Sequence, residues 1–313
     1  MLAIFETMSS KVRHQGLSKR QLGYLLLMPA ILLIGFVSVY PFFLTIWYSF
    51  HKILLNVPTS GRPFVGFDNY LKLFGTSRFI SSLVTTALFS FIWVTTQFVA
   101  GMLIALILNL DFKGRAFVRA SVLVPWSMAF VITGLLWKWM YNPVFGFINA
   151  LLMSLGIISQ QINWLGTTTF AASISVLIVE LWRNTPFMAL ILLAGLQGIP
   201  AELYEAARID GAGRISCFRH VTLPQLRHAM LVALLFRSID AFRSFDILFV
   251  LTRGGPGTTT EILSLHAYKT LFQYFDFGKG SAITVVMAII TTALSIMYIR
   301  LLSEKAEKKE VAS

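Results

Sequence analysis

Residues 205–224 read EAARIDGAGRISCFRHVTLP, a polar and charged segment that lies between two apolar runs. The chain as a whole is strongly apolar, because 56% of its 313 residues are hydrophobic and only 13% are charged. A soluble domain carries roughly 25% charged residues. The segment is therefore expected to be an aqueous loop between two membrane spans of an all-α protein, since helices satisfy their own backbone groups in lipid.

The apolar runs are long enough to cross a bilayer. Residues 22–50, 79–110 and 280–299 contain no Asp, Glu, Lys or Arg, and a span needs about 20 apolar residues. We predict six transmembrane helices, at residues 22–48, 79–110, 117–141, 167–198, 228–252 and 280–302. They define a membrane domain over residues 22–302, which includes the loop 199–227 and is flanked by terminal segments 1–21 and 303–313.

Lys and Arg are unevenly divided between the two sides that six spans would define. Residues 1–21, 111–119, 199–227 and 300–313 contain 15 of them, and residues 49–78, 138–166 and 253–279 contain 8. Since cytoplasmic loops carry the excess of Lys and Arg, we expect both termini and the loop 199–227 to be cytoplasmic. The net charge is +12, but the Lys and Arg that carry it lie between apolar runs rather than on one soluble face. We therefore expect no nucleic-acid partner.

The loop itself predicts two short amphipathic helices around a glycine hinge. Pro200 suits a first helical turn, and Glu202 and Glu205 near that end favour the helix dipole. Gly211 follows Asp210 and can take a positive φ without penalty. The pattern fits a surface on which another protein docks, and it equally fits a loop packed on its own membrane domain.

The spacing within this loop resembles the cytoplasmic signature of binding-protein-dependent ABC importer permeases. The outer segments FVGFDNYLKLF (residues 64–74) and LTRGGPGTTTE (residues 251–261) agree with the carbohydrate branch of that family, specifically the maltose/trehalose type. One departure is a valine where the family usually has isoleucine. The matching signature residues are Glu205, Ala206, Ala207, Gly211, Val221, Leu223 and Pro224.

The resemblance implies a type I ABC importer permease fold in the bacterial cytoplasmic membrane, with this loop as the coupling helix. The implied partners are a second permease that forms a heterodimer, two ATPase subunits, a periplasmic or lipid-anchored solute-binding protein, and membrane lipid. The implied substrate is a sugar such as trehalose or maltose, with glycerol phosphate or a monosaccharide as alternatives. ATP and Mg would bind the ATPase partner, and the turn-rich outer loop at Gly254, Gly255 and Pro256 is a candidate docking loop for the binding protein.

No catalytic or metal-binding pattern occurs in the chain. A G-x-x-x-x-G-K-[ST] phosphate loop is missing, as are an H-E-x-x-H pair and a G-x-S-x-G elbow. The single cysteine, Cys217, excludes an intramolecular disulfide framework. We therefore expect a protein that is not an enzyme and holds no cofactor or metal of its own.

Charged residues inside two predicted spans are the candidate substrate pathway. Such charges are costly in a bilayer, so they pair, face the bundle interior or line a wet cavity. They could contact sugar hydroxyls while aromatic rings stack on the sugar, or they could form a structural ladder of i,i+3 ion pairs; Asp240 is the foremost pathway candidate. The set comprises Glu180, Trp182, Arg183 and Asn184 in the fourth span, and Arg237, Asp240, Phe242, Arg243, Phe245 and Asp246 in the fifth.

Two other classes of protein would also carry six spans. An ion-coupled secondary transporter uses carboxylates at mid-membrane, and it would work without an ATPase. A membrane enzyme would need the catalytic constellation that the sequence lacks. The sequence therefore predicts an ATP-driven permease subunit, with the ion-coupled transporter as the alternative.

Overall fold

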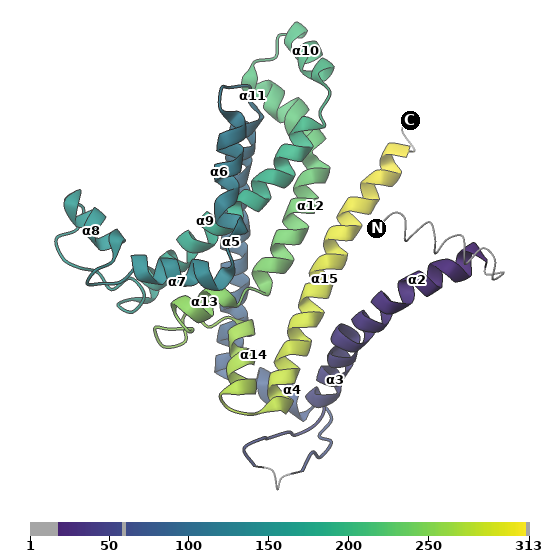
Figure 1. Cartoon of the computed structure of the whole chain (residues 1–313), viewed down its shortest axis with the longest axis vertical. Helices are drawn as coiled ribbons and strands as arrows, with labels where there is room; N and C mark the ends of the chain where they lie inside the picture. The colour runs from purple at the N-terminus through teal and green to yellow at the C-terminus, as the bar shows by residue number, and fades with distance from the viewer. Residues whose placement is uncertain (1–17, 58–60, 311–313) are drawn as a thin grey trace, which may run out of the picture.

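The chain is helical throughout the part that the computed structural model describes, residues 18–57 and 61–310 (Figure 1). Within these ranges, extended pairing is limited to two isolated bridges, His51 with Phe64 and Leu54 with Asp276. The first half holds α2 (Lys19–Ile34), the π-helix η1 (Gly35–Val39), α3 (Tyr40–Ser49), α4 (Asp68–Phe74), α5 (Ser77–Asn109), α6 (Arg115–Ser127), α7 (Phe130–Met140) and α8 (Phe147–Ser154). The second half holds α9 (Thr169–Gln197), α10 (Ala201–Ile209), α11 (Arg214–Cys217), the π-helix η3 (Phe218–Thr222), α12 (Leu223–Phe242), α13 (Asp246–Leu251), α14 (Leu263–Phe272) and α15 (Phe277–Glu310).

Four helical segments in the described ranges are long and apolar enough to cross a membrane. They are Arg20–Ser49, which joins α2, η1 and α3, then Ser77–Asn109, Thr169–Gln197 and Phe277–Leu302. Their positions agree with the predicted first, second, fourth and sixth spans. The bilayer supplies no hydrogen bonds, so continuous helices of this length are the expected form.

The predicted third span, residues 117–141, is broken in the structure into α6 and α7. α6 and α7 are bent by 93° relative to each other, because Met128 and Ala129 have extended backbone with ψ of 141°. Arg183 on α9 donates a hydrogen bond to the carbonyl of Met128 at 3.0 Å. That bond satisfies a backbone group that the break would otherwise leave exposed in the membrane domain.

The prediction of a single fifth span over residues 228–252 also needs correction. The helix starts earlier, at Leu223, and ends at Phe242, and Asp246 begins the separate helix α13. Ser244 stabilises the break, because its carbonyl accepts a hydrogen bond from Ser264 and its hydroxyl donates to Glu180. Asp246 therefore does not continue the helix that carries Asp240.

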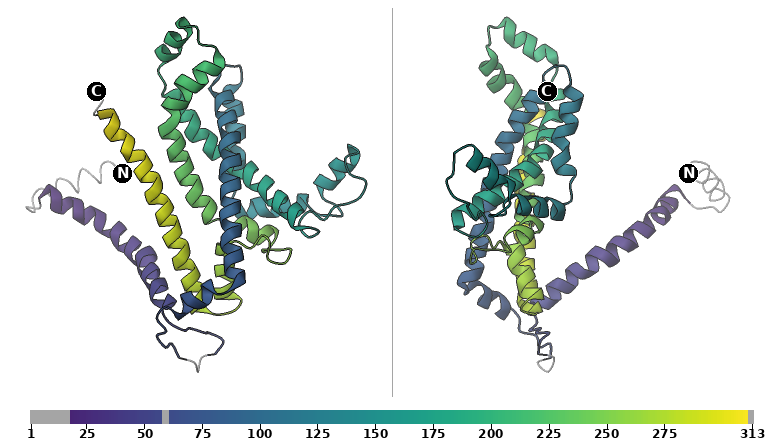
Figure 2. Two further views of the ribbon diagram at one scale, coloured as in Figure 1. Left: turned by 180° about the vertical axis from the view of Figure 1, so that it is seen from behind. Right: turned by 60° about the vertical axis from the view of Figure 1, so that its left-hand side comes forward.

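The core of the bundle lies where α5, α9 and α12 pack together. One cluster of buried side chains joins α5, α9 and α12 and includes Met102, Met188 and Leu226. A second joins α5, α7, α9 and α13 around Trp93 and Trp137. By contrast, the most apolar window of Arg20–Ser49 has no buried side chain, and α2 stands away from the other helices (Figure 2).

The two ends of the bundle are built differently. The loop end consists of α10 and α11 with the neighbouring ends of α5 and α9, because residues from all four line one cavity of about 820 Å³. The distal end holds α4 and α14, and α15 runs from there toward the loop end (Figure 1). The segments 111–119 and 199–227 thus lie at the same end of the bundle, where Arg119 of α6 donates to the carbonyl of Leu108 on α5.

Candidate functional site

A buried charge network ties three helices together halfway along the bundle. Arg237 of α12 is 2% exposed and donates to Glu180 of α9 at 2.8 Å, to Asp240, and to the side chain of Gln97 on α5. Gln97 in turn donates to the carbonyl of Glu180 at 2.9 Å. An uncompensated charge in such a place would cost several kcal/mol, so these partners fix Arg237 in one position.

Glu180 is the anionic centre of this network. Its carboxylate also accepts hydrogen bonds from Asn184 at 2.6 Å and from Ser244 at 3.2 Å. Asp240 differs from Glu180, because its side chain is 52% exposed. One acid therefore serves as an internal counter-ion, and the other remains open to a ligand.

Asp240 opens into a cavity of about 420 Å³ between α9, α12 and the α6–α7 break. On one wall the rings of Trp126 and Phe187 stack with centroids 5.7 Å apart, and the Arg183 guanidinium lies 3.4 Å from the centroid of Phe130. A charged group and aromatic faces together suit a polar ligand with apolar faces. The cavity is lined by Trp126, Phe130, Arg183, Asn184, Phe187, Phe236, Arg237, Ile239, Asp240 and Arg243.

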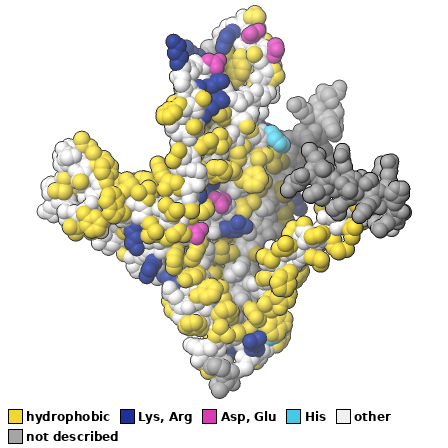
Figure 3. All heavy atoms as spheres, viewed as in Figure 1, with side chains coloured by type: hydrophobic (Ala, Val, Ile, Leu, Met, Phe, Trp, Pro, Cys, Tyr) yellow, Lys and Arg dark blue, Asp and Glu magenta, His cyan; other side chains and the backbone are white. Residues whose placement is uncertain are grey.

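A small patch of charge is visible on the apolar face of the bundle (Figure 3). The larger group of Lys, Arg, Asp and Glu lies at the loop end, and the surface between the two is mostly apolar (Figure 3). Charged side chains between the two ends of a membrane-spanning bundle must form ion pairs or face a water-filled cavity. The patch fits the network and cavity described above.

The structure brings five of the sequence-predicted pathway residues to the cavity, with Glu180 directly behind them. Three aromatic candidates lie elsewhere: Trp182 packs on Trp137, Phe242 is buried in an apolar cluster, and Phe245 stacks on Phe249. Asp246 also lies outside the cavity lining, and of the proposed ladder only the Arg237–Asp240 pair forms within α12. The five are Arg183, Asn184, Arg237, Asp240 and Arg243.

Sequence reasoning missed the partner on α5 and the aromatic lining. Gln97 is an amide near the middle of the charge-free run 79–110, and that position was a usable signal. The lining rings gave no signal, because they sit among 27 Phe and 7 Trp residues without a distinguishing pattern. The missed lining rings are Trp126, Phe130, Phe187 and Phe236.

The loop between α9 and α12 begins with the predicted short helix and hinge. α10 follows Pro200 and ends at Ile209, with Asp210 as its C-cap. Gly211 has φ of +81°, a left-handed conformation that costs other residues about 1–2 kcal/mol. Glu205 and Ala206 are exposed. The hinge thus presents α10 away from the bundle at the loop end (Figure 1).

The sequence predicted that the second half of the loop ends at Leu223 and Pro224, before the next span begins. In the structure it continues into that span. α11, η3 and α12 form an uninterrupted helical backbone from Arg214 to Phe242. The wider π-turns over Phe218–Thr222 lie directly before Pro224, whose ring would clash with the carbonyl four residues earlier in a regular helix. A single helical path therefore connects the loop to Arg237 and Asp240.

The loop exposes apolar side chains that its own domain does not cover. Ile209 is 86% exposed and Ile215 is 74% exposed. Ala207, Val221 and Leu223 are half-buried, so this part of the loop packs on the bundle. Ile209 and Ile215 are left uncovered by the described chain.

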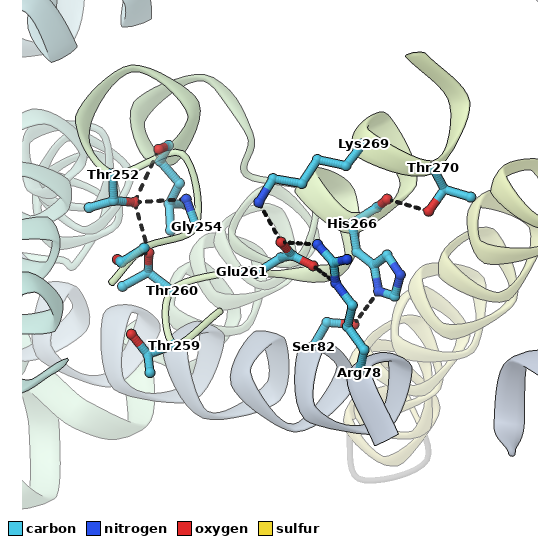
Figure 4. Close-up of polar contacts among 12 residues, drawn as sticks. Arg78, Ser82, Thr252, Gly254, Thr259, Thr260, Glu261, His266, Lys269 and Thr270 are labelled. Carbon is cyan, nitrogen blue, oxygen red and sulfur yellow. Dashed lines mark hydrogen bonds and ion pairs between the residues drawn. The ribbon is translucent and has the colours of Figure 1, made fainter. Parts of the chain in front are cut away.

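At the distal end, the predicted docking loop is held by hydrogen bonds between threonines and its backbone (Figure 4). The hydroxyls of Thr252 and Thr260 lie 2.7 Å apart, and Thr260 donates to the carbonyl of Gly255. Gly254 has φ of +90°, and a Cβ there would meet Glu261 and Lys269 at 3.0–3.1 Å. The loop therefore has a fixed shape that requires glycine at this position.

Glu261 anchors that loop to two helices (Figure 4). Arg78 of α5 donates to both of its carboxylate oxygens at 2.7 and 2.8 Å, and Lys269 of α14 forms an ion pair at 2.5 Å. Burial alone would raise the pKa of Glu261, but the bonds from Arg78 and Lys269 outweigh it and lower the pKa. The anchor stays ionised at neutral pH.

His266 lies beside this cluster and contacts the same helix of the bundle. Its Nδ1 is 3.0 Å from the hydroxyl of Ser82 on α5 (Figure 4). Burial is the main cause that lowers the pKa of His266 below its ordinary value. The imidazole is therefore neutral in the folded protein near pH 7.

Residues 97–306, more than half of the chain, match the family model of binding-protein-dependent transport system inner membrane components. The chain belongs to this family. The permease is 40% identical to the trehalose/maltose transport system permease protein MalF of Thermococcus litoralis, over 94% of this chain and 96% of that protein. It is 38% identical to the sulfoquinovosyl glycerol permease SmoG of Agrobacterium fabrum, over 94% of each chain. It is 34% identical to the trehalose permease SugA of Mycobacterium tuberculosis, over 97% of this chain and 94% of that protein.

The fold of the permease is also found in a solved structure. A bacterial ABC transporter involved in the import of the acidic polysaccharide alginate has a chain that superimposes with a TM-score of 0.78. The identity is 23%, and the match covers 90% of this chain and 95% of that chain. The family predicted from residues 205–224 is thus confirmed, and the permease is an inner-membrane protein.

Proposed function

We propose that this permease is one membrane-spanning subunit of an ATP-driven sugar importer. The observation that carries the proposal is the helical path from Arg214 to Phe242, which joins the exposed loop at one end to the cavity at the other. A movement imposed on the loop would reach Arg237 and Asp240 through one rigid element. A helix of this kind couples two distant sites by differential contacts at each.

The cavity between α9 and α12 is the proposed sugar site. Asp240 would accept hydrogen bonds from sugar hydroxyls, while Arg183 and Asn184 would donate to sugar oxygens. The rings of Trp126 and Phe187 would pack on the CH faces of the sugar. The volume of about 420 Å³ is within the usual range for a small-ligand site.

The loop 199–227 is the proposed coupling element. Glu205 would pair with a basic residue of an ATPase subunit, and the exposed Ile209 and Ile215 would be covered in the complex. Ala206, Ala207 and Gly211 would allow close approach, and Val221, Leu223 and Pro224 would join the contact to α12. In this arrangement the loop end faces the cytoplasm, and ATP and Mg bind the ATPase.

Six crossings complete the proposed arrangement. They are Arg20–Ser49, α5, α6 with α7, α9, α12 and α15, with both termini in the cytoplasm. A second permease would pair with this one, because the first span has no buried side chain in its apolar window. An external binding protein would deliver sugar at the loop around Gly254, Gly255 and Pro256, and the alginate transporter has been crystallised with its sugar-bound periplasmic protein.

The proposed substrate is a disaccharide such as trehalose or maltose. Relatives at 40% and 34% identity are named for these sugars. A relative at 38% identity is named for sulfoquinovosyl glycerol, so an anionic glycoside is a second candidate. Glycerol phosphate and monosaccharides complete the panel to be tested.

The test is uptake by proteoliposomes that contain the two permeases, the ATPases and the binding protein. Radiolabelled trehalose, maltose, a sulfonated glycoside, glycerol phosphate and a monosaccharide would be compared, each with its own excess of unlabelled ligand. We expect uptake of a sugar only when ATP is inside and binding protein outside. Uptake by this chain alone under an ion gradient would instead establish the ion-coupled secondary transporter and overturn the proposal.

A further inference from the structure

Residues 130–166, here the lateral arm, leave the bundle sideways. The arm begins where α7 turns by 93° from α6 and carries α8 well away from the other helices (Figure 1). The distribution of Lys and Arg assigned residues 138–166 to the outer side of the membrane, where the aromatic and turn residues of 141–156 favour a short interfacial helix or cap. The contacts of the arm with α9 define its depth.

The depth of the turn follows from its contact with α9. α6 has 13 residues and is therefore about 20 Å long, which is shorter than the hydrocarbon thickness of about 30 Å. The turn at Met128 is bonded to Arg183, the middle residue of the 29-residue helix α9. The arm thus starts near the centre of the bilayer.

The far end of α7 lies near the edge of one leaflet. The hydroxyl of Tyr141 donates to the carbonyl of Ser175 at 3.2 Å, and Ser175 precedes Arg183 on α9 by about 12 Å along the axis. Half of the hydrocarbon thickness is about 15 Å. The exposed Trp139 therefore falls at the depth where aromatic belts occur, and the exposed Lys138 beside it can reach the headgroups.

The chemistry of the arm suits the same environment. Residues 139–179 contain no Asp, Glu, Lys or Arg, and Phe145, Leu155 and Ile157 are 62–65% exposed. The buried Asn149 satisfies four partners: its amide donates to the carbonyls of Pro143 and Ile162 and accepts from the Ile162 N–H and the Trp164 indole. Internal satisfaction of polar groups is what a low-dielectric surrounding demands.

We propose that the lateral arm lies within one leaflet of the membrane, with α8 at the boundary between headgroups and acyl chains. Lipid would then cover Phe145, Leu155 and Ile157. The arm shows a mostly apolar surface without blue or magenta side chains around α8 (Figure 3), and it continues from a helix that starts inside the bundle. The occupant of this surface is lipid, by depth and by lack of charge, rather than water or a protein partner.

The experiment uses single-cysteine variants of the assembled importer in lipid nanodiscs. Cys217→Ser provides the background, and Phe145→Cys and Ile157→Cys each carry an environment-sensitive NBD label. Thr258→Cys, exposed on the distal loop, is the control in water and is measured without binding protein, which we propose to dock at this loop. We expect the two arm labels to emit at shorter wavelength than the control, with at least about a twofold loss of intensity in lipids brominated along the acyl chains.

Two outcomes would overturn the proposal. Quenching of the arm labels by aqueous iodide to the level of the Thr258→Cys control would place the arm in water. Insensitivity to both quenchers, with an emission change when binding protein or the second permease is withheld, would show a protein cover. If one variant fails to assemble, Leu155→Cys has a similar exposure and takes its place.

Discussion

At the scale of single residues, the two acids beside Arg237 have separate tasks. Glu180 is 1% exposed and satisfies the buried guanidinium, whereas Asp240 is about half exposed toward the cavity. A buried ion pair contributes little net stability but is costly to break. Of the i,i+3 ladder suggested by the sequence, only the Arg237–Asp240 pair forms, and the same Asp240 is the acid that we propose for the sugar site.

Asp240→Asn should impair sugar uptake more than basal ATP hydrolysis. A hydrogen bond to a charged group is worth roughly 1.5–3 kcal/mol, so transport should fall about tenfold or more. The measurements are uptake and ATPase rates of the reconstituted complex. Asp246→Asn is the control, because Asp246 lies outside the cavity lining, and an equal loss of both activities by Asp240→Asn would assign it a purely structural role.

His266 should make the fold less stable in mild acid. Its pKa is lowered in the folded state, so the unfolded chain, with an ordinary pKa of about 6.5, takes up a proton first as the pH falls. The melting temperature of the complex should therefore decrease from pH 7 to pH 5, and His266→Gln should flatten that slope. The exposed His220→Gln serves as control, and an unchanged slope in His266→Gln would count against this role.

At the scale of elements, the helix from Arg214 to Phe242 is the connection between the two proposed sites. Its path through η3 accommodates Pro224 without a break. α10, in contrast, joins this helix through Gly211, and its Tyr204 hydroxyl lies 3.0 Å from the hydroxyl of Thr222 in η3. In the proposed arrangement the continuous helix would transmit a movement of the loop to the cavity, and α10 would contact the ATPase subunit.

Glu205→Ala should reduce sugar-stimulated ATP hydrolysis about tenfold, because one charge-assisted hydrogen bond to the ATPase subunit would be lost. The membrane domain should stay folded, since Glu205 is exposed. Glu202→Ala is the matched control on the same helix. The stimulated rates of the two variants would be compared in proteoliposomes, and equal rates would remove the coupling role of Glu205.

Gly211→Ala should weaken association with the ATPase subunit by about 1–2 kcal/mol, the cost of a left-handed backbone for a residue with a side chain. Space is not the cause, because a Cβ at Gly211 or at Gly213 meets nothing within 4 Å. Gly213 has φ of −73°, so Gly213→Ala should behave as wild type. Co-purification of the ATPase at increasing salt would separate the two, and equal retention would show that the hinge geometry is dispensable.

At the scale of the whole molecule, the bundle has a loop end that carries most of the visible charge and a distal end tied by the Glu261 cluster (Figures 3 and 4). The proposed sidedness follows from the distribution of Lys and Arg. A sugar would arrive over the distal loop and leave past the loop end. The cavity lies between these ends, as alternating access requires.

Cysteine labelling checks this sidedness directly. In right-side-out vesicles, Thr258→Cys in a Cys217→Ser background should react with a membrane-impermeant maleimide. The native Cys217, which is half-buried in the loop, should react only after the membrane is permeabilised. The reverse pattern would invert the proposed topology.

The sequence predicted four spans well, because long runs without charge leave few alternatives. It failed at Met128–Ala129 and at residues 243–245, where breaks depend on bonds from Arg183 and from Ser264, far away in the chain. Similarly, the alternating charges predicted Arg237 and Asp240 as a site. Gln97 and the lining rings required the packing of α5, α6 and α9, which no local pattern contains.

The charge-free stretch from 139 to 179 also bears on how the chain is made. Insertion orients spans by Lys and Arg in the short loops beside them, and this stretch offers none after Lys138. The orientation of α6 and α9 during synthesis must then be set by Lys113, Arg115 and Arg119 before the arm and by the basic residues of the loop 199–227 after it. A pair of new lysines in the arm would compete with these signals during membrane insertion. The defect would then be a smaller amount of the protein in the membrane, and not a slower transport rate per inserted molecule.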